Sequence, residues 1–222
     1  MRVVSVNVGL PRTVLWQGRE VTTAIFKKPV EGRVALRATN LEGDRQADPT
    51  VHGGPEKAVY AYPVEHYARW RRELPDLELP PQLAGIPLGS FGENLTVEGL
   101  PLEDEIAVGD RYRIGSAELT VTQPRLPCYK LGLRFQRVDM VKRFLASGRT
   151  GWYFSVAREG SVAAGDPVEL LERHPAGIAV SAVTRAYAVE RHDAPALALL
   201  AELEPLPADW RKHFAKQLAA LA

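Results

Sequence analysis

Short apolar segments alternate with Gly- and Pro-containing turns along roughly the first 172 residues of the chain. In the clearest case, apolar and polar residues alternate on both sides of Gly115-Ser116, which is typical of a β-hairpin. The hairpin is expected at 110–122, and further strands at 1–10, 34–36, 151–156 and 167–171. Short strands spaced in this way predict a barrel or a sandwich.

Two segments with helical periodicity interrupt these strands. After Pro63, which suits the first turn of a helix, the apolar residues Tyr67 and Trp70 recur at helical spacing. A second helix is expected to begin at Asp139, a good N-cap residue, and to end at Gly148.

The pattern changes after His174, where the chain becomes rich in Ala and Leu. Three helices are expected there, at 181–188, 193–203 and 207–221. In the last one, an apolar stripe is formed by Trp210, Phe214, Leu218 and Leu221. We therefore expect a mainly β domain with short helices at 1–174 and a three-helix appendage at 178–222. An appendage of this size is small for independent stability.

Composition and charge narrow the class of protein. The 222 residues include 28 Lys and Arg against 27 Asp and Glu, so the basic excess of a dedicated nucleic-acid binder is missing. No apolar run approaches the ~20 residues that span a bilayer, and the N-terminus alternates like a strand rather than a signal peptide. The single Cys cannot form an intrachain disulfide, which fits a reducing compartment. We expect a cytoplasmic protein without nucleic-acid or membrane partners; its oligomeric state is not predicted.

The segment 123–131, QPRLPCYKL, holds the most informative chemistry. Pro124 and Pro127 stiffen the backbone around Cys128, directly after the predicted hairpin. Arg125 and Lys130 add two nearby cations, and positive charge stabilises a thiolate over a thiol. A stiff loop suits a metal-binding thiolate. A small buried hydrophobe is the more common role of a lone Cys, and the residues alone leave both interpretations open.

A second segment, 43–48 followed by 52–57, contains paired glycines. Gly53 and Gly54 allow backbone amides to approach a ligand closely, and Lys57 adds a charge for a phosphate. The spacing of a P-loop is missing. In such a loop, His52 is more often a hydrogen-bonding residue than a metal ligand, and no spacing suggests a zinc site.

A third segment, 91–97, places Glu93 and Asn94 between a glycine and a predicted strand. Their side chains either reach into the mouth of a barrel or bond their own backbone in a turn, and the sequence favours neither role. No GxSxG or HExxH motif indicates a hydrolase.

Taken together, these segments resemble the signatures of the MOSC domain family, in its YiiM-type subgroup, which is similar to 6-N-hydroxylaminopurine reductases. The resemblance rests on 42–48 with 51–58, on 91–95 and on 123–131, in the order of the family. Residues 151–156, 160–166 and the three-helix tail extend it to nearly the whole chain. It implies a mostly β barrel whose mouth holds a pyranopterin-dithiolene molybdenum cofactor.

The resemblance also implies roles for individual residues. Cys128 would supply the protein's thiolate to molybdenum, since soft sulfur ligands suit such a metal. Candidates to neutralise the pterin phosphate are Arg125, Lys130 and Lys57, with backbone amides from Gly53 and Gly54. Candidates to bond the polar pterin edge or the substrate are Gln46, His52 and Asn94.

The implied reaction reduces N-hydroxylated compounds, of the hydroxylaminopurine or amidoxime type, to amines and water. One Cys cannot ligate a four-Cys iron–sulfur cluster, so electrons would come from an external donor such as a flavoprotein reductase or a ferredoxin. Two alternatives share the same fold: a sulfur carrier with a persulfide on Cys128, and a non-catalytic module that binds the molybdenum cofactor. The physiological substrate and the identity of the donor are not predicted.

Overall fold

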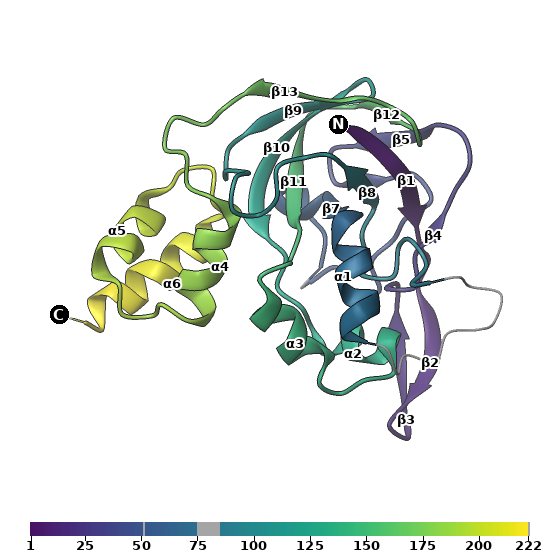
Figure 1. Ribbon diagram of the computed structural model, residues 1–222, viewed down its shortest axis with the longest axis horizontal. Coiled ribbons are helices and arrows are strands. Elements are labelled where there is room, and N and C mark those ends of the chain that lie inside the picture. The colour runs from purple at the N-terminus through teal and green to yellow at the C-terminus, as the bar shows by residue number, and fades with distance from the viewer. Residues whose placement is uncertain (51, 75–84, 222) are drawn as a thin grey trace.

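The computed structural model describes residues 1–50, 52–74 and 85–221 (Figure 1). Its strands are β1 (Arg2–Val8), β2 (Arg12–Trp16), β3 (Arg19–Thr23), β4 (Lys28–Pro29), β5 (Val34–Arg37), β6 (Asn40–Leu41), β7 (Val59–Pro63), β8 (Leu95–Glu98), β9 (Arg111–Ile114), β10 (Ala117–Pro124), β11 (Trp152–Arg158), β12 (Gly160–Val162) and β13 (Val168–Glu172). Its helices are the 3₁₀ turn η1 (Pro55–Lys57), α1 (Glu65–Glu73), α2 (Tyr129–Phe135), α3 (Met140–Ser147), α4 (Val180–Ala188), α5 (Ala194–Glu202) and α6 (Ala208–Ala219).

Eight strands form one curled sheet in the order β13-β9-β10-β11-β7-β8-β1-β4. Neighbours are antiparallel except for the parallel pair β7 and β8. The sheet nearly closes on itself, because Val3 N–H donates to the Asp166 carbonyl (2.9 Å) and the Val3 carbonyl accepts from Gly165 N–H (2.8 Å). An isolated bridge between Arg2 and Pro167 marks this junction. The sheet is therefore curled like the expected barrel, but it is not fully closed. β1 and the start of β13 meet at a single bridge and not along a continuous strand pairing.

Two hydrophobic clusters fill the protein. The first lies inside the curled sheet around Tyr112, Trp152 and Phe154, all fully buried. The second is aromatic and lies under α1, α2 and α3, where Tyr62 stacks on Phe91 with ring centroids 4.5 Å apart. Aromatic rings bury large apolar areas, so this second cluster holds the helices against the sheet beside the segment that leaves β10.

The three-helix tail packs on the sheet as part of the first cluster. Phe214 of α6 is fully buried in the same cluster as the sheet residues. The backbone continues the contact, since Val180 N–H donates to the Ile106 carbonyl and Val108 N–H to the Ile178 carbonyl, both at 2.9 Å. Figure 1 shows the tail against one end of the sheet, with α4 nearest to β10. The tail thus shares its core with the sheet.

Most of the expected elements are confirmed. The hairpin forms as β9 and β10, and Gly115 at its turn has a positive φ of 60°. The predicted strands at the N-terminus, at 34–36, 151–156 and 167–171 correspond to β1, β5, β11 and β13, and the three C-terminal helices to α4, α5 and α6. None of the helices in the described part of the chain is long and apolar enough to cross a bilayer.

Three local expectations were wrong. Pro63 is the last residue of β7, and the helix begins two residues later, because the backbone of Pro63 is still part of the sheet. Asp139 occupies the N-cap position of α3 but caps no backbone amide, since its carboxylate pairs with Arg137 and Arg143 instead. Leu221 lies beyond α6 and is 40% exposed, so the apolar stripe ends before it.

The hairpin of β2 and β3 was not predicted from the sequence. Its two-residue turn, Gln17-Gly18, has positive φ at both positions (49° and 75°), as in the type I′ turns that suit twisted hairpins. β2 and β3 pair only with each other among the described strands. The residues after β3 form one wall of a cavity, so this hairpin belongs to the surroundings of the candidate site.

Candidate functional site

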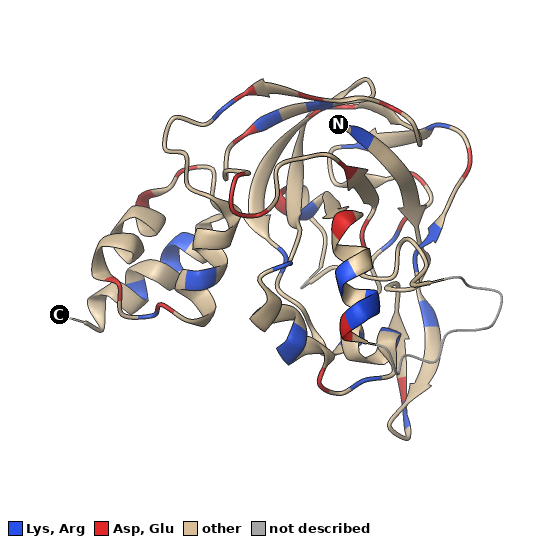
Figure 2. Ribbon diagram, viewed as in Figure 1, with Lys and Arg blue, Asp and Glu red and all other residues tan. Residues whose placement is uncertain are grey.

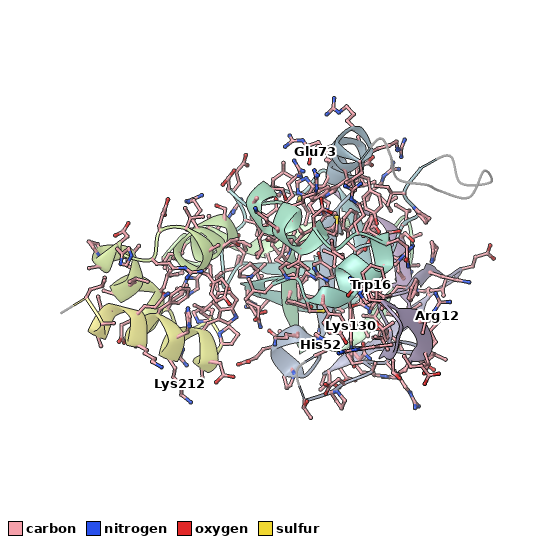
Figure 3. The ribbon with its side chains drawn as sticks, turned by 90° about the horizontal axis from the view of Figure 1, so that it is seen from below. Arg12, Trp16, His52, Glu73, Lys130 and Lys212 are labelled. Atoms are coloured by element: carbon pink, nitrogen blue, oxygen red, sulfur yellow. The ribbon has the colours of Figure 1, made fainter. Side chains whose placement is uncertain are left out.

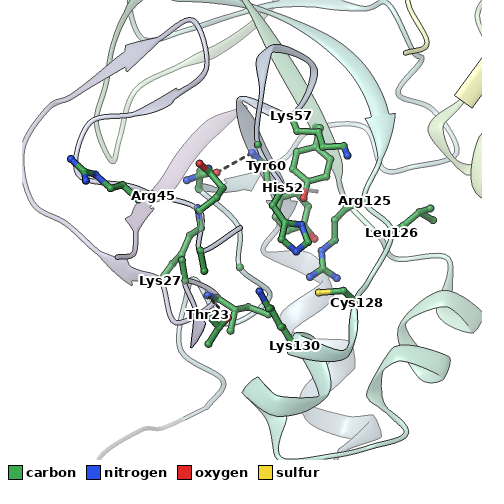
Figure 4. Close-up of a pocket in the computed structure, with 18 residues that line it drawn as sticks. Thr23, Lys27, Arg45, His52, Lys57, Tyr60, Arg125, Leu126, Cys128 and Lys130 are labelled. Carbon is green, nitrogen blue, oxygen red and sulfur yellow. Dashed lines mark hydrogen bonds between the residues drawn. The ribbon is translucent and has the colours of Figure 1, made fainter. Parts of the chain in front are cut away.

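A cavity with about 700 Å³ of empty space, partly open to solvent, joins the three segments singled out in the sequence (Figure 4). The predicted residues that line it are Gln46, His52, Gly53, Lys57, Asn94, Arg125, Cys128 and Lys130. Gly54 is described too but does not line the cavity; it caps η1 with a φ of 89°.

Cys128 lies where the loop after β10 meets α2, and its side chain is half-buried. Burial disfavours the thiolate of Cys128, but a hydrogen bond with His52, the charge of Arg125 and the backbone N–H of Lys130 outweigh it. Together they lower the pKa of Cys128 from 9.0 to about 7. A large share of Cys128 is therefore thiolate at neutral pH, which supports the reactive interpretation of the lone Cys over the inert one.

Arg125 is a buried cation with an unused donor. Its guanidinium lies over the rings of Phe144 and Tyr60, 5.1 and 5.5 Å from the ring centroids, and also hydrogen-bonds Tyr153. Its Nη1 is buried and has no hydrogen-bond partner in the structure. A buried unpaired donor is costly, so its retention beside Cys128 points to an anionic ligand.

Lys57 and Lys130 add two further cations to the rim of the cavity. Both are half-buried, and within the described residues neither has a carboxylate at ion-pairing distance. Figure 4 shows Arg125, Lys130 and His52 around Cys128. In Figure 3, His52 and Lys130 lie close together, on the same part of the molecule as Trp16 of β2 and far from Lys212 of α6. Three positive charges around one cavity favour an anion such as a phosphate group.

The opposite wall carries an ion pair that was not predicted from the sequence. Lys27 Nζ lies 2.5 Å from Asp44 Oδ2, with side-chain exposures of 10% and 0%. Asp44 also accepts hydrogen bonds from Gly9 N–H (2.8 Å) and Asn94 Nδ2 (2.9 Å). Burial lowers the pKa of Lys27, although the negative charges of Asp44 and Glu93 oppose the shift. Lys27 is thus a desolvated ammonium that faces the cavity across from Cys128 (Figure 4).

Asn94 and Glu93 have different roles: Asn94 lines the cavity, whereas Glu93 stabilises a turn. Asn94 lines the cavity, but its Nδ2 donates to Asp44 and to the Asn7 carbonyl (3.4 Å), and its Oδ1 accepts from Tyr60 N–H (3.2 Å). Its amide hydrogens are therefore engaged within the protein. Glu93 is fully buried and accepts from the backbone of Gly89 (2.8 Å) and Phe91 (3.1 Å), which is the turn-forming role. Burial raises the pKa of Glu93, and the shift is opposed first by the hydrogen bond from the Tyr67 hydroxyl, then by backbone N–H donors and the hydroxyl of Thr96.

The glycine loop, residues 52–57, is held in place by close packing at Gly53. Gly53 has a φ of 82°, and a Cβ at this position would lie 2.9 Å from the Gln46 side chain. Gln46 also accepts a hydrogen bond from Asn40 (3.4 Å). Only glycine fits such a backbone conformation and contact without strain, so Gly53 brings His52 and Gln46 to the same wall.

The remaining lining residues were not predicted: Thr23, Ala24, Ile25, Lys27, Arg45, Ala47, Tyr60, Gly92, Leu126 and Tyr153. Five of them stand outside every segment singled out in the sequence: Thr23, Ala24, Ile25, Lys27 and Tyr60. No group of three His, Cys, Asp or Glu in the described part of the chain could hold a metal ion. A metal bound here would therefore need most of its ligands from a cofactor, with Cys128 as the protein's contribution. One thiolate, an unpaired buried Arg donor and the two lysines Lys57 and Lys130 fit an anionic, metal-bearing cofactor.

This combination of fold and site defines the class of protein. The MOSC domain matches residues 48–169, more than half of the chain, and the chain belongs to this family. Residues 178–221 match the YiiM-like, 3-alpha helix domain, which corresponds to α4, α5 and α6. The mixed fold of curled sheet, short helices and helical tail is thus the fold expected from the sequence.

Individual relatives agree with this assignment. The chain is 40% identical to YflK of Bacillus subtilis (strain 168) over 220 residues, 97% of this chain and 93% of that protein. It is similar to the crystal structure of YiiM from Geobacillus stearothermophilus, with a TM-score of 0.80, 35% identity and 98% of each chain covered. A protein of Gibberella moniliformis (strain M3125 / FGSC 7600) named "Reductase" is 38% identical over 191 residues, 86% of this chain but only 32% of that longer protein.

Proposed function

We propose that this protein is a molybdenum-cofactor-dependent reductase of N-hydroxylated compounds, of the hydroxylaminopurine or amidoxime type. The observation that carries the proposal is Cys128, a thiol with a pKa of about 7 in a cavity beside the unpaired Nη1 of Arg125. A thiolate that is available at neutral pH is a suitable soft ligand for a transition metal. Membership of the MOSC family and the name of the fungal relative support a reductase.

The cations of the cavity would hold the phosphate of the cofactor. Arg125 is placed to use its free Nη1, and Lys57 and Lys130 would add charge from the rim. Backbone amides of Gly53 and Gly54 are further candidates, although only Gly53 of the two lines the cavity. For the polar pterin edge or the substrate, Gln46 and His52 line the cavity, while Asn94 would act mainly by holding Asp44.

The overall reaction converts R-NHOH, two electrons and two protons into R-NH₂ and water. The bound cofactor would supply the two-electron chemistry. The described residues contain no second Cys that could hold an iron–sulfur cluster, so the electrons would come from an external flavoprotein reductase or ferredoxin. The single Cys also fits a reducing compartment, and we place the protein in the cytoplasm.

Lys27 is the residue that we assign to proton donation. Its ammonium is desolvated and faces the cavity, and Asp44 fixes its position. A lysine whose pKa is lowered by burial releases a proton more readily at neutral pH than an exposed lysine does. Lys27 Nζ would give its proton to the oxygen that leaves as water when the N–O bond breaks.

The test begins with metal content. The wild-type protein and Cys128→Ser are produced in a host that makes the cofactor, with added molybdate, and molybdenum per chain is measured by elemental mass spectrometry. We expect near-stoichiometric metal in the wild type and its loss in Cys128→Ser. Turnover is then measured with hydroxylaminopurine and an amidoxime, with reduced methyl viologen as electron donor. Metal absent from both proteins, under conditions that load another molybdenum enzyme, would refute the proposal.

A sulfur carrier is the second candidate, because the same low thiol pKa suits a persulfide on Cys128. Cyanide-labile sulfur on purified protein that lacks molybdenum would favour it. A non-catalytic cofactor-binding module predicts bound cofactor without turnover of either substrate. Molybdenum content, turnover and cyanide-labile sulfur together therefore separate the three functions.

A further inference from the structure

A hydrogen bond joins the three-helix tail to β10, two residues before Arg125 of the candidate site. Trp210 Nε1 of α6 donates to Gln123 Oε1 of β10 at 2.6 Å. Gln123 is only 2% exposed, and its Nε2 donates in turn to the carbonyl of Glu56 at 3.2 Å. The indole of Trp210 packs between Tyr187 and Phe214, with ring centroids 5.3 and 5.7 Å away, so its position is fixed by the tail.

The end of β10 is shaped for this contact. Consecutive residues of a regular strand point to opposite faces, yet Thr122 Oγ1 also donates to the carbonyl of Glu56, at 2.7 Å. The pairing of β10 with β11 shifts register between Val121 and Gln123. Such a bulge redirects side chains, and here it brings two neighbours onto one acceptor. The carbonyl of Glu56 is therefore held from β10 by two donors.

Gln123 connects the two loops that carry the site. Glu56 lies in η1, between the glycine loop with His52 and the cavity residue Lys57. On the other side, the strand that contains Gln123 continues directly into Arg125 and the loop to Cys128. The Gln123 amide thus joins the 52–57 loop to the 125–128 loop.

We infer that Trp210 is a positioning residue of the site, which acts through Gln123 to hold the 52–57 loop against the 125–128 loop. An indole N–H can only donate, so it fixes which end of the buried Gln123 amide is the oxygen. The amide nitrogen then faces the carbonyl of Glu56. Without the indole donor, the amide loses the contact that sets its orientation. In this way the tail becomes part of the framework of the cavity.

The test uses hydrogen exchange of the full-length protein without cofactor, read by mass spectrometry on peptides that cover 52–58. Trp210→Phe keeps an aromatic ring and removes the donor. We expect exchange in 52–58 to become about five- to tenfold faster, with α5 unchanged. Tyr187→Phe is the matched control, because it alters a neighbour of the same indole and leaves the hydrogen bond in place; it should leave 52–58 unchanged.

Two further variants keep the inference testable if Trp210→Phe disturbs the tail. Gln123→Glu still accepts from Trp210 but cannot donate to the carbonyl of Glu56, so it should accelerate exchange in 52–58 alone. In a Gln123→Leu background, Trp210→Phe should add no further acceleration, because the two changes break the same connection. Additive effects, or faster exchange confined to the tail, would overturn the inference. The experiment needs neither cofactor nor turnover, so its outcome is independent of the proposed reductase function.

Discussion

His52 and Cys128 are hydrogen-bonded to each other, and this contact joins the glycine loop to the loop that follows β10. Burial alone would raise the pKa of the thiol. The hydrogen bond with His52 is the largest of the opposing effects, followed by the charge of Arg125. The contact therefore decides how much thiolate is present at neutral pH, and with it the chemistry that the cavity can support.

This relationship predicts a pH profile for Cys128. The thiolate fraction rises with pH and reaches one half at about pH 7, so alkylation by iodoacetamide should rise through that pH and then level off. Because the chain has a single Cys, the measured rate reports on Cys128 alone. His52→Ala should move the profile to higher pH and slow the reaction at pH 7 by roughly three- to tenfold. Arg45→Ala, on the far wall, is the control, and an unshifted profile in His52→Ala would contradict the assignment.

The sequence pattern predicted those elements whose formation depends on interactions between residues close together in the chain. Alternation around Gly115 identified the hairpin because both its turn and its buried face are encoded within a dozen residues. The N-cap role of Asp139 was wrong, because Arg137 and Arg143 compete for the same carboxylate. Charges of both signs are interspersed over the sheet and helices (Figure 2), so charge runs in the sequence did not mark the site.

The site was predicted only in part, for a related reason. Cys128, Arg125 and the glycine loop stand in distinctive segments, so their resemblance to a family was visible. Lys27 stands beside Lys28 in the sequence, and only its contact with Asp44 distinguishes it as buried. Gln123 likewise gains its role from α6, through a contact that folding alone creates.

Lys27→Arg should remove the proton donor while it preserves the stability of the fold. The guanidinium can keep the ion pair with Asp44, but it does not release a proton near neutral pH. We expect thermal stability near that of the wild type, retained molybdenum, and turnover reduced by roughly 10²- to 10⁴-fold. Lys28→Arg changes the neighbouring exposed lysine and should have no effect. Equal turnover in the two variants would remove Lys27 from the mechanism.

Asp44→Asn should instead destabilise the fold. Asp44 is fully buried at its side chain, pairs with Lys27 and accepts two further hydrogen bonds. Removal of one partner of a buried ion pair leaves the other charge uncompensated, which typically costs about 3 to 5 kcal/mol. Urea denaturation would measure the free energy of unfolding. A loss below about 1 kcal/mol would contradict this prediction, because it would mean that Asp44→Asn leaves no uncompensated charge at Lys27.

Arg125→Met should weaken cofactor retention with little change in stability. The variant loses the two contacts of the guanidinium with aromatic rings and its hydrogen bond with Tyr153, but it also removes a buried donor without a partner, so losses and gain offset each other to within about 1 kcal/mol. Molybdenum per chain and thermal denaturation are measured on the same preparations. Arg134→Met is the control, since Arg134 also has an unpaired nitrogen but lies outside the cavity. Strong destabilisation of Arg125→Met would indicate a structural role instead.

Phe214→Ala should show that the tail and the sheet unfold together. Phe214 of α6 is fully buried in the cluster that also contains Val121 of β10, so its loss opens a cavity in a core that both parts share. Truncation of a buried Phe typically costs about 3 to 5 kcal/mol. Far-UV circular dichroism reports mainly on helices, while alkylation of Cys128 reports on the sheet domain. In urea the two midpoints should coincide in the wild type and shift by equal amounts in Phe214→Ala. A separate early transition seen only by dichroism would mean that the tail is an independent unit. The hydrogen bond from Trp210 to Gln123 would then join two parts of the protein that unfold separately.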